Sequence, residues 1–476
     1  SYFRLQMLAL WASIRMEDDP HGAIAALDSA IRGQAALRSA DRLIPLYRQR
    51  ARAWRKLGHA GHERADLDTL LAISERVRDA TPALAARTAM ADSVWSEVNR
   101  LVMLAVAAGQ PDQALRYLER GREPFSRLPS ASRRGVFRVP PGQTALDLTL
   151  IGDTLLAWTV RGGRATLTRS TVHGASLRAL IHETDAALAR GDTGAAVDRR
   201  LEQLHGFLVR PVLGQLAAAN SALLIVADGD IASAPFAALR DPASGRYLME
   251  ERILRFAPAL PTTARADAAR TAARTLVVAD PTLDHGTDGG LPTLPGARAE
   301  AATVLRLYPD AVLLQGGAAT RPAVVHALSS AEMVHYAGHA VFIEDRPATS
   351  YLALAPGPSG GSGHLTAAEL STLDLGGVRL IVLSACRVNA STSGRSGGFA
   401  GLAGALLYAG AGSVLGSQWQ VDDQRTRTLM RAFQSAYRES GDGARSLRSA
   451  QLAMRWAGDP ALRSPSAWAG FRLSTR

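Results

Sequence analysis

Short apolar runs that bury both faces of a strand constrain the fold of this 476-residue chain more than any other feature. Residues 223–227 and 380–384 read LLIVA and LIVLS, and neither run alternates apolar with polar side chains. Such strands are typical of a mostly parallel sheet that helices cover on both faces. Strand and helix patterns alternate from about residue 216 to the end, so we predict an α/β fold for this part.

The first 128 residues carry a different pattern, with apolar side chains at spacings of three and four throughout. Gly58 and Gly109 each separate the large apolar residues of one helix from the small ones of the next. Both stretches resemble the helical hairpins of tetratricopeptide repeats, whose period is about 34 residues. The two glycines are 51 positions apart, which predicts an additional helix between the hairpins. An ordinary helical bundle fits the same pattern, and the sequence leaves both open.

Changes in composition mark the domain boundaries. Residues 129–142 are rich in Pro, Ser and Arg and predict a linker after the helical region of residues 1–128. We divide the rest into two parts. Residues 143–270 begin with three short strand patterns and continue with helices, and residues 271–476 carry the candidate chemistry.

Charge and cysteine content narrow the classes of function. The formal net charge is +11, and Lys56 is the one lysine among 54 basic residues. The arginines are spread along the chain without a clustered stripe, so we expect a solvated Arg-rich surface and no nucleic-acid partner. The one cysteine, Cys386, excludes internal disulfides and Cys-rich metal sites and leaves one candidate for thiol chemistry. We expect no cofactor.

No signal-peptide pattern opens the chain, and no apolar run is long enough to span a bilayer. Residues 397–421 carry no charge, but their seven glycines favour a buried helix followed by a buried strand. The chain begins at Ser1 within a helical pattern, which leaves open a longer natural protein. We predict a cytoplasmic protein with no membrane partner.

Two strand ends carry reactive side chains. A strand that begins at Glu332 leads to His339, and the strand that ends at Ser384 leads to Cys386. Because ligands bind beyond the carboxyl ends of strands in open α/β sheets, neighbouring strands would bring imidazole and thiol to one rim. An imidazole beside a thiol favours the nucleophilic thiolate. The spacing of 47 residues agrees with the caspase pattern, in which the His lies about 50 residues before the Cys.

At these residues the chain resembles the CHAT peptidases, a caspase-like family that is related to separase and occurs attached to tetratricopeptide repeats. VHYAGHAVF around His339 and LIVLSAC at Cys386 look like its two active-site motifs. Further segments agree with the family in order, namely residues 225–239, 247–260, 277–281, 294–301, 397–423 and 468–474. The resemblance runs from about residue 146 to the end and implies an α/β caspase-like fold after an all-α tetratricopeptide-like region.

The resemblance also implies roles for the motif residues. Cys386 would be the nucleophile and His339 the general base. The backbone N–H groups of Cys386 and Ala340 would form the oxyanion hole, although family members commonly have Gly where Ala340 stands. His335 lies within the strand and is expected to be a core histidine with satisfied hydrogen bonds.

Residues 417–423 are the candidates for substrate specificity. In Arg-cleaving relatives an acidic residue of this segment lines the pocket, and the pattern W-x-V-x-D places Asp423 there. We therefore name Asp423, Asp422, Gln418 and Trp419 as substrate-binding candidates, since a buried carboxylate pairs well with guanidinium. The two aspartates can equally cap the helix that follows, and the sequence leaves both roles open.

These residues predict a cysteine endopeptidase that cleaves a protein substrate and is Arg-directed if Asp423 lines the pocket. A regulatory or substrate protein bound to the helical repeats would gate it. The alternative is a non-catalytic interaction scaffold with a caspase-like binding module. Metal and nucleotide sites are not predicted, because His335 and His339 lack the Glu of H-E-x-x-H and residues 357–363 lack the spacing of a nucleotide loop.

Overall fold

The computed structural model describes residues 2–36, 40–122, 137–262, 274–283, 291–357, 360–385, 388, 401–420 and 422–476. The chain divides into two compact units, Ser1–Arg134 and Gly135–Arg476, which we call the helical unit and the α/β unit. The predicted nucleophile, Cys386, lies outside the described residues. In the part of the chain that is described, no helix has the length and apolar character to cross a membrane.

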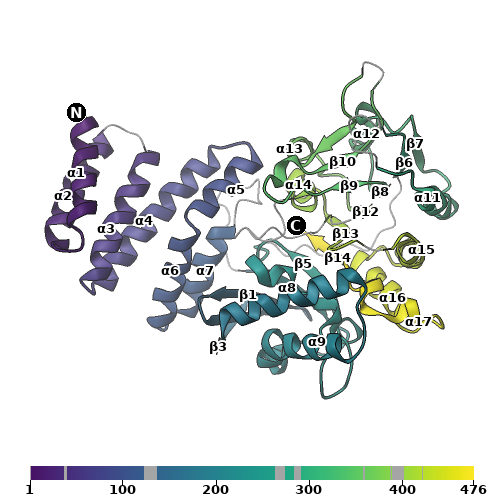
Figure 1. Ribbon diagram of the computed structural model, residues 1–476, viewed down its shortest axis with the longest axis horizontal. Helices are drawn as coiled ribbons and strands as arrows, with labels where there is room; N and C mark the ends of the chain where they lie inside the picture. The colour runs from purple at the N-terminus through teal and green to yellow at the C-terminus, as the bar shows by residue number, and fades with distance from the viewer. Residues whose placement is uncertain are drawn as a thin grey trace. The chain divides into compact units, whose positions relative to one another are not determined.

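The helical unit is a row of helices, each packed on its neighbours (Figure 1). Its described α-helices are α1 (Tyr2–Arg15), α2 (Pro20–Ala36), α3 (Leu43–Lys56), α4 (Ala60–Asp79), α5 (Leu84–Ser93), α6 (Trp95–Ala107) and α7 (Pro111–Arg122). Gly58 and Gly109 turn the chain from α3 to α4 and from α6 to α7, with φ of 74° and 68° that favour Gly. Both predicted hairpins are present, and α5 is the additional helix between them.

Buried carboxylates hold the helices of this unit together. Glu63 of α4 is 1% exposed and accepts from Arg55 of α3 at 2.5 Å and from Arg100 of α6 at 2.7 Å. Burial opposes ionisation of Glu63, but the bonds from Arg100 and Arg55 outweigh it and hold its pKa below the ordinary value. Glu75 of α4 pairs in the same way with Arg120 of α7. A solvated Arg surface is therefore an incomplete prediction, because these arginines bridge helices.

The α/β unit alternates strands with helices. Its described strands are β1 (Thr144–Ile151), β2 (Thr154–Arg161), β3 (Arg164–Thr171), β4 (Ala222–Ala227), β5 (Ile253–Ala257), β6 (Thr275–Pro281), β7 (Val312–Gly316), β8 (Met333–Ala337), β9 (Ala340–Val341), β10 (Tyr351–Ala353), β11 (His364–Thr366), β12 (Leu380–Ser384), β13 (Ser413–Ser417) and β14 (Phe471–Thr475). Its described α-helices are α8 (Gly174–Arg190), α9 (Ala195–Leu208), α10 (Leu248–Glu251), α11 (Pro295–Leu307), α12 (Arg321–Leu328), α13 (Ala367–Leu370), α14 (Leu402–Ala409), α15 (Asp423–Ser440), α16 (Gly443–Arg455), α17 (Pro460–Arg463) and α18 (Pro465–Trp468).

Eleven of the described strands form one sheet, in the order β3-β2-β1-β4-β5-β14-β13-β12-β8-β6-β7. Neighbours from β13 to β7 are parallel, and so are β1, β4, β5 and β14. Because β14 is antiparallel to β13, the two parallel sets run in opposite directions. We call the carboxyl ends of the β13-to-β7 set the first rim and those of the β1-to-β14 set the second rim. The predicted mostly parallel sheet with flanking helices is confirmed (Figure 1).

Two adjacent side chains of β8 show what covers each face of the sheet. His335 is fully buried and contacts Glu300 of α11 and Gln434 of α15. The next side chain, Tyr336, points to the opposite face and donates to the carbonyl of Ala353 in β10. Helices α11 and α15 therefore cover one face here, and a small sheet of order β11-β10-β9 lies on the other.

A continuous apolar core joins the two strand sets. It contains Val382 and Leu415 of the first set, Ile225 of the second and Phe433 of α15, all at most 1% exposed. Burying a side chain of this size stabilises the fold by about 1.5–3 kcal/mol. The core holds the strands in register, and polar side chains lie at the two rims.

Candidate functional site

The first rim brings the two predicted catalytic segments side by side. β8 and β12 are parallel neighbours, and Ala337 at the end of β8 lies opposite Ser384 at the end of β12. His339 and Cys386 each follow two residues later in the sequence. The sequence argument required neighbouring strands, and this requirement is met.

His339 is held by a backbone carbonyl. Its Nε2 donates to the carbonyl oxygen of Pro292, in the segment that leads into α11, at 2.8 Å. A carbonyl can only accept, so Nε2 carries the hydrogen and Nδ1 is the nitrogen that can take up a proton. The residue is half-buried, so part of its side chain is exposed to solvent. This is the tautomer that a general base needs.

The backbone at His339 is fixed from two sides. The Tyr336 hydroxyl shares its one hydrogen between the carbonyls of His339, at 2.6 Å, and Ala353, at 2.9 Å. The Ala353 N–H donates to the His339 carbonyl at 2.9 Å. The hydroxyl also lies close to Gly338, where an added Cβ would come within 2.7 Å of its oxygen. The close approach of the tyrosine ring therefore requires the Gly of the Y-A-G-H motif.

The N–H of Ala340, a predicted oxyanion donor, points away from its partner strand. Ala340 lies opposite Leu352 in the antiparallel pair of β9 and β10. Because the Ala353 N–H donates to the His339 carbonyl, Ala340 occupies a non-hydrogen-bonded position, and its N–H faces the open side of β9. β9 is at the edge of its sheet. The β9–β10 ladder therefore leaves this N–H to another acceptor.

A buried polar network lies behind the two strands. Glu300 accepts from the Ser384 hydroxyl at 3.0 Å and from His335 Nε2 at 2.7 Å. Gln434 donates to His335 Nδ1 at 2.9 Å, so both ring nitrogens are bonded. These four side chains are at most 9% exposed. His335 is the satisfied core histidine that its position predicts, and the network ties β8 and β12 to α11 and α15.

Ser417 anchors the backbone next to the cysteine. Its buried hydroxyl, at the end of β13, donates to the carbonyl of Ala385 at 2.8 Å. Ala385 directly precedes Cys386. The bond therefore holds the peptide group that leads into the predicted nucleophile.

The two aspartates after β13 have different surroundings. Asp422 caps α15, because its Oδ1 accepts from the N–H of Arg425 at 3.0 Å. The Asp423 carboxylate rests on Gly296 in the first turn of α11, where an added Cβ would lie 1.8 Å from Oδ2. Partial burial raises the pKa of the Asp423 carboxyl, and the charge of Glu300, one turn further along α11, raises it again. Asp423 is exposed and brings its charge to the rim.

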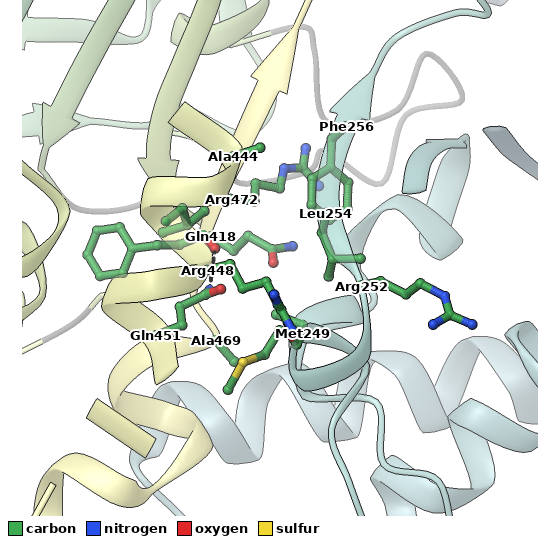
Figure 2. Close-up of a pocket in the computed structure, with 13 residues that line it drawn as sticks. Met249, Arg252, Leu254, Phe256, Gln418, Ala444, Arg448, Gln451, Ala469 and Arg472 are labelled. Atoms are coloured by element: carbon green, nitrogen blue, oxygen red, sulfur yellow. Dashed lines mark hydrogen bonds between the residues drawn. The ribbon is translucent and has the colours of Figure 1, made fainter. Parts of the chain in front are cut away.

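Gln418 and Trp419 are interior residues. Trp419 is 3% exposed, and its indole N–H donates to the carbonyl of Ser466 at 3.3 Å. The Gln418 side chain lines a pocket between β5, β14 and α16, together with Arg448 and Arg472 (Figure 2). Of the four substrate-binding candidates, Asp423 is therefore the one that combines exposure with a charge outside a helix cap.

The described residues offer no metal site, since no three His, Cys, Asp or Glu side chains among them are grouped as such a site requires. His335 and His339 are four positions apart but do not act together. The ring of His335 is enclosed by Glu300 and Gln434, whereas that of His339 bonds to the backbone at Pro292.

The sequence model of the CHAT domain matches residues 198–476, more than half of the chain. The chain belongs to the CHAT domain family. Every candidate residue described above lies within the matched range, so the CHAT domain contains the whole of the first rim from β6 to β13. The predicted resemblance and the predicted caspase-like fold are confirmed.

Curated relatives of this CHAT chain are tetratricopeptide repeat proteins. Tetratricopeptide repeat protein 28 of Mus musculus is 29% identical over 334 residues, and that of Homo sapiens is 27% identical over 327 residues. Each alignment covers 57% of this chain and 13% of the relative, so the chain spans a small part of their length. The helical unit fits the repeats that give these relatives their name.

Solved structures share the fold. A chain of the Saccharomyces cerevisiae separase–securin complex matches with a TM-score of 0.51 and 9% identity, over 96% of this chain and 44% of that one. The Arg-specific cysteine proteinase gingipain R matches with a TM-score of 0.35 and 13% identity, over 62% of this chain and 73% of that one. At such identities the separase match is evidence of fold alone.

Sequence reasoning assigned no individual role to four residues of this CHAT domain, although each lies in a segment that it matched to the family, namely Asp280, Gly296, Glu300 and Ser417. Asp280 follows an apolar strand directly, and that position was the signal that could have marked it. Gly296 and Glu300 carry no such signal, because their roles arise where α15 packs on α11. Ser417 acts through a neighbouring strand that lies 32 positions away in sequence.

Proposed function

We propose that this CHAT protein is a cysteine endopeptidase with Cys386 as nucleophile and His339 as general base. The observation that carries the proposal is the pairing of Ala337 with Ser384 at the first rim, two residues before the imidazole and the thiol. The bond from His339 Nε2 to Pro292 supports it, because this bond leaves Nδ1 to accept a proton.

The proposed reaction has two stages. His339 takes the thiol proton, the Cys386 thiolate attacks the scissile carbonyl carbon, and the C–N bond breaks as His339 gives the proton to the leaving amine. His339 then deprotonates a water molecule that hydrolyses the thioester and restores the thiol. We assign the oxyanion to the N–H groups of Cys386 and Ala340, and the outward-facing N–H of Ala340 supports this assignment.

We place the basic side chain of the substrate at Asp423. Its carboxylate is exposed and has no part in the cap, which Asp422 supplies. Burial and the charge of Glu300 raise the pKa of this carboxyl, although the charge of Arg427 opposes them. The guanidinium of a substrate would add a positive charge and two parallel hydrogen bonds. Cleavage after Arg is therefore the specificity that we propose.

The helical unit is the proposed binding site for a regulatory or substrate protein. The separase–securin complex is a fold neighbour that covers 96% of this chain, and the curated relatives are named for their repeats. Both findings support a protein partner, and gating by that partner is part of the proposal.

Two measurements on the full chain test the proposal. The first is labelling with an Arg acyloxymethyl ketone, detected by intact mass. The second is hydrolysis of fluorogenic peptides that differ in the residue before the cleaved bond. We expect one label on the wild type and none on Cys386→Ala, with Arg peptides hydrolysed by the wild type alone. Absence of both label and hydrolysis from the wild type, with and without a protein bound to the helical unit, would contradict the protease. A protein that binds the helical unit of that inactive chain would support the interaction scaffold instead.

A further inference from the structure

Asp280 has an unusual backbone for a residue with a side chain. It lies near the end of β6, the neighbour of β8 on the first rim, and is 5% exposed. Its φ of 40° falls in the left-handed region that residues with a Cβ rarely adopt, and the register of β6 with β7 shifts at the same place. Such strain persists where the surrounding structure requires it, and it collects at functional sites.

Both carboxylate oxygens of Asp280 hold the chain at the start of α11. Oδ1 accepts from the N–H of Leu294 at 2.9 Å, and Oδ2 accepts from Nε of Arg298 at 2.5 Å. Leu294 is the residue before α11, and Arg298 lies in the first turn. The carboxylate therefore joins two parts of the chain that are 14 positions apart and sets the path of the segment before the helix.

That segment carries the oxygen that orients His339. Pro292 is two residues before Leu294, and its carbonyl accepts from His339 Nε2 at 2.8 Å. Pro292 and Thr293 are exposed, so packing of their side chains does little to fix this carbonyl. We propose that Asp280 is a positioning residue for His339, acting through Leu294 and Pro292; this role rests on the proposed protease function.

The proposal predicts a particular kind of defect. Asp280 does not contact the reacting atoms, so its loss should displace the imidazole indirectly. Asp280 also holds the turn of α11 that carries Gly296 beneath Asp423, so the decisive measurement must be one that does not depend on Asp423. The thiolate of Cys386 would then form at higher pH, because it would lose the support of a correctly placed imidazole. We expect kcat to fall on Arg and uncharged peptides alike, since the imidazole serves both.

The pH dependence of Cys386 alkylation by iodoacetamide in the full chain measures this effect without any substrate. We expect the wild type to alkylate at lower pH than an ordinary thiol, whose pKa is near 8.5. Asp280→Ala should shift the profile upward toward that of His339→Ala and lower kcat about 10- to 100-fold. Asp280→Asn keeps one acceptor for Leu294 and should give a smaller shift, with a kcat about three- to tenfold below the wild type.

Asp153→Ala is the matched control. Asp153 also ties a loop to the start of a helix, because its Oδ1 accepts from the N–H of Gly174 at 2.9 Å, but it lies on the second rim. Its loss should lower Tm and leave the alkylation profile unchanged. An Asp280→Ala profile that coincides with the wild type, or one that Asp153→Ala reproduces, would overturn the proposal. If Asp280→Ala does not fold, Asp280→Asn is the deciding variant. An Asp280→Asn protein with the alkylation profile and kcat of the wild type would overturn the proposal. A wild-type thiol with an ordinary profile and no peptidase activity would instead be the failure of the proposed function.

Discussion

The first rim and the second rim of the sheet are supported by similar interactions. On the first, Asp280 ties a loop to the start of α11, and on the second, Asp153 ties a loop to the start of α8. Each rim also carries a histidine whose ring is hydrogen-bonded, half-buried His339 on the first and exposed His182 on the second. His339 donates to a backbone carbonyl, whereas His182 pairs with the carboxylate of Asp230 at 2.7 Å.

The rims differ in how their charges are matched. On the second rim, Asp230 faces His182, and buried Asp228 accepts from the Thr149 hydroxyl at 3.0 Å. On the first rim, Asp423 rests beside Glu300, and its pKa is raised by burial and by that negative charge. The acids of the second rim therefore have partners within the fold, and Asp423 is the acid of the first rim that we propose as the binding site for a basic side chain. The same kind of hydrogen bond, from a loop carboxylate to the start of a helix, can stabilise the fold alone or also position a reactive side chain. Which of these it does depends on whether the neighbouring strand leads to a reactive residue.

The largest expected effect separates the two histidines. His339→Gln and Cys386→Ala should each lower kcat/KM on peptides by at least about 10³-fold, because they remove the general base and the nucleophile. His182→Gln should leave activity within about twofold, since its partner is a surface carboxylate. Purified variants compared by peptide hydrolysis and thermal melting check this, and equal losses for both histidines would show that the rims do not differ as proposed.

The next effect separates the two aspartates of the first rim. Asp423→Asn should lower kcat/KM on Arg peptides about 10- to 100-fold, because a charge-assisted hydrogen bond contributes about 1.5–3 kcal/mol. Uncharged peptides should be nearly unaffected. Asp422→Asn is the control, since Asn caps helices about as well as Asp. Equal losses on Arg and uncharged peptides would assign Asp423 a structural role instead.

The pH dependence of specificity should follow the ionisation of Asp423. Burial and Glu300 raise the pKa of this carboxyl above its ordinary value of 3.8. The ionised form binds a cation, so preference for Arg over an uncharged residue should rise with pH through the Asp423 pKa and fall about tenfold per unit below it. The ratio of kcat/KM for the two peptides removes the titration of the Cys and His. A ratio that is flat in wild type and Asp423→Asn alike would refute the assignment.

A smaller effect is expected from filling the space beneath the Asp423 carboxylate. The Cβ of Gly296→Ala would lie 1.8 Å from Oδ2, so the exposed aspartate side chain must swing away. We expect a loss of about five- to tenfold on Arg peptides with no loss of helix stability, since Ala favours helix more than Gly does. Gly317→Ala is the control, because an added Cβ there meets nothing within 4 Å. Unchanged specificity in Gly296→Ala would place the substrate elsewhere.

The smallest effect compares two buried hydroxyls, one for each rim. Ser417→Ala removes the bond to Ala385 and should lower kcat about two- to fivefold, and Thr149→Val removes the bond to Asp228 and should leave kcat unchanged. Both should cost about 0.5–1.5 kcal/mol of stability, because each removes a hydrogen bond made by a buried hydroxyl. Urea unfolding together with steady-state kinetics separates the two effects. A kcat loss in Thr149→Val would contradict the separation.

The sequence predicted most strands of the α/β unit because their apolar runs are continuous. The apolar runs at residues 223–227 and 380–384 lie within β4 and β12. β5 and β14 were not predicted as strands, because Arg255 and Arg472 interrupt their apolar patterns. Arg472 is 2% exposed, and its Nη1 donates to the carbonyl of Ala232, a contact that lies 240 positions away in sequence. Local pattern holds no information about such a distant partner.

The candidate site likewise has features that the sequence predicted and features that only the structure shows. Its chemistry was legible in the sequence because reactive side chains follow apolar strands, and this singled out His339, Cys386 and Asp423. The structure assigns the cap of α15 to Asp422, and the pocket role of Asp423 stays a prediction. Both aspartates are equally good cap candidates in the sequence, and the packing of α15 on α11 gives them different surroundings.

By itself, the sequence determined the kind of fold, the family and the residues that offer chemistry, because periodicity and motif spacing are properties of the chain. The tertiary structure decided which of those residues share a rim and which groups support them. Glu300 meets Ser384 across 84 positions, and Asp280 meets Leu294 across 14. These contacts depend on the order of strands in the sheet and on the packing of α11 and α15, which form only when the apolar core is buried.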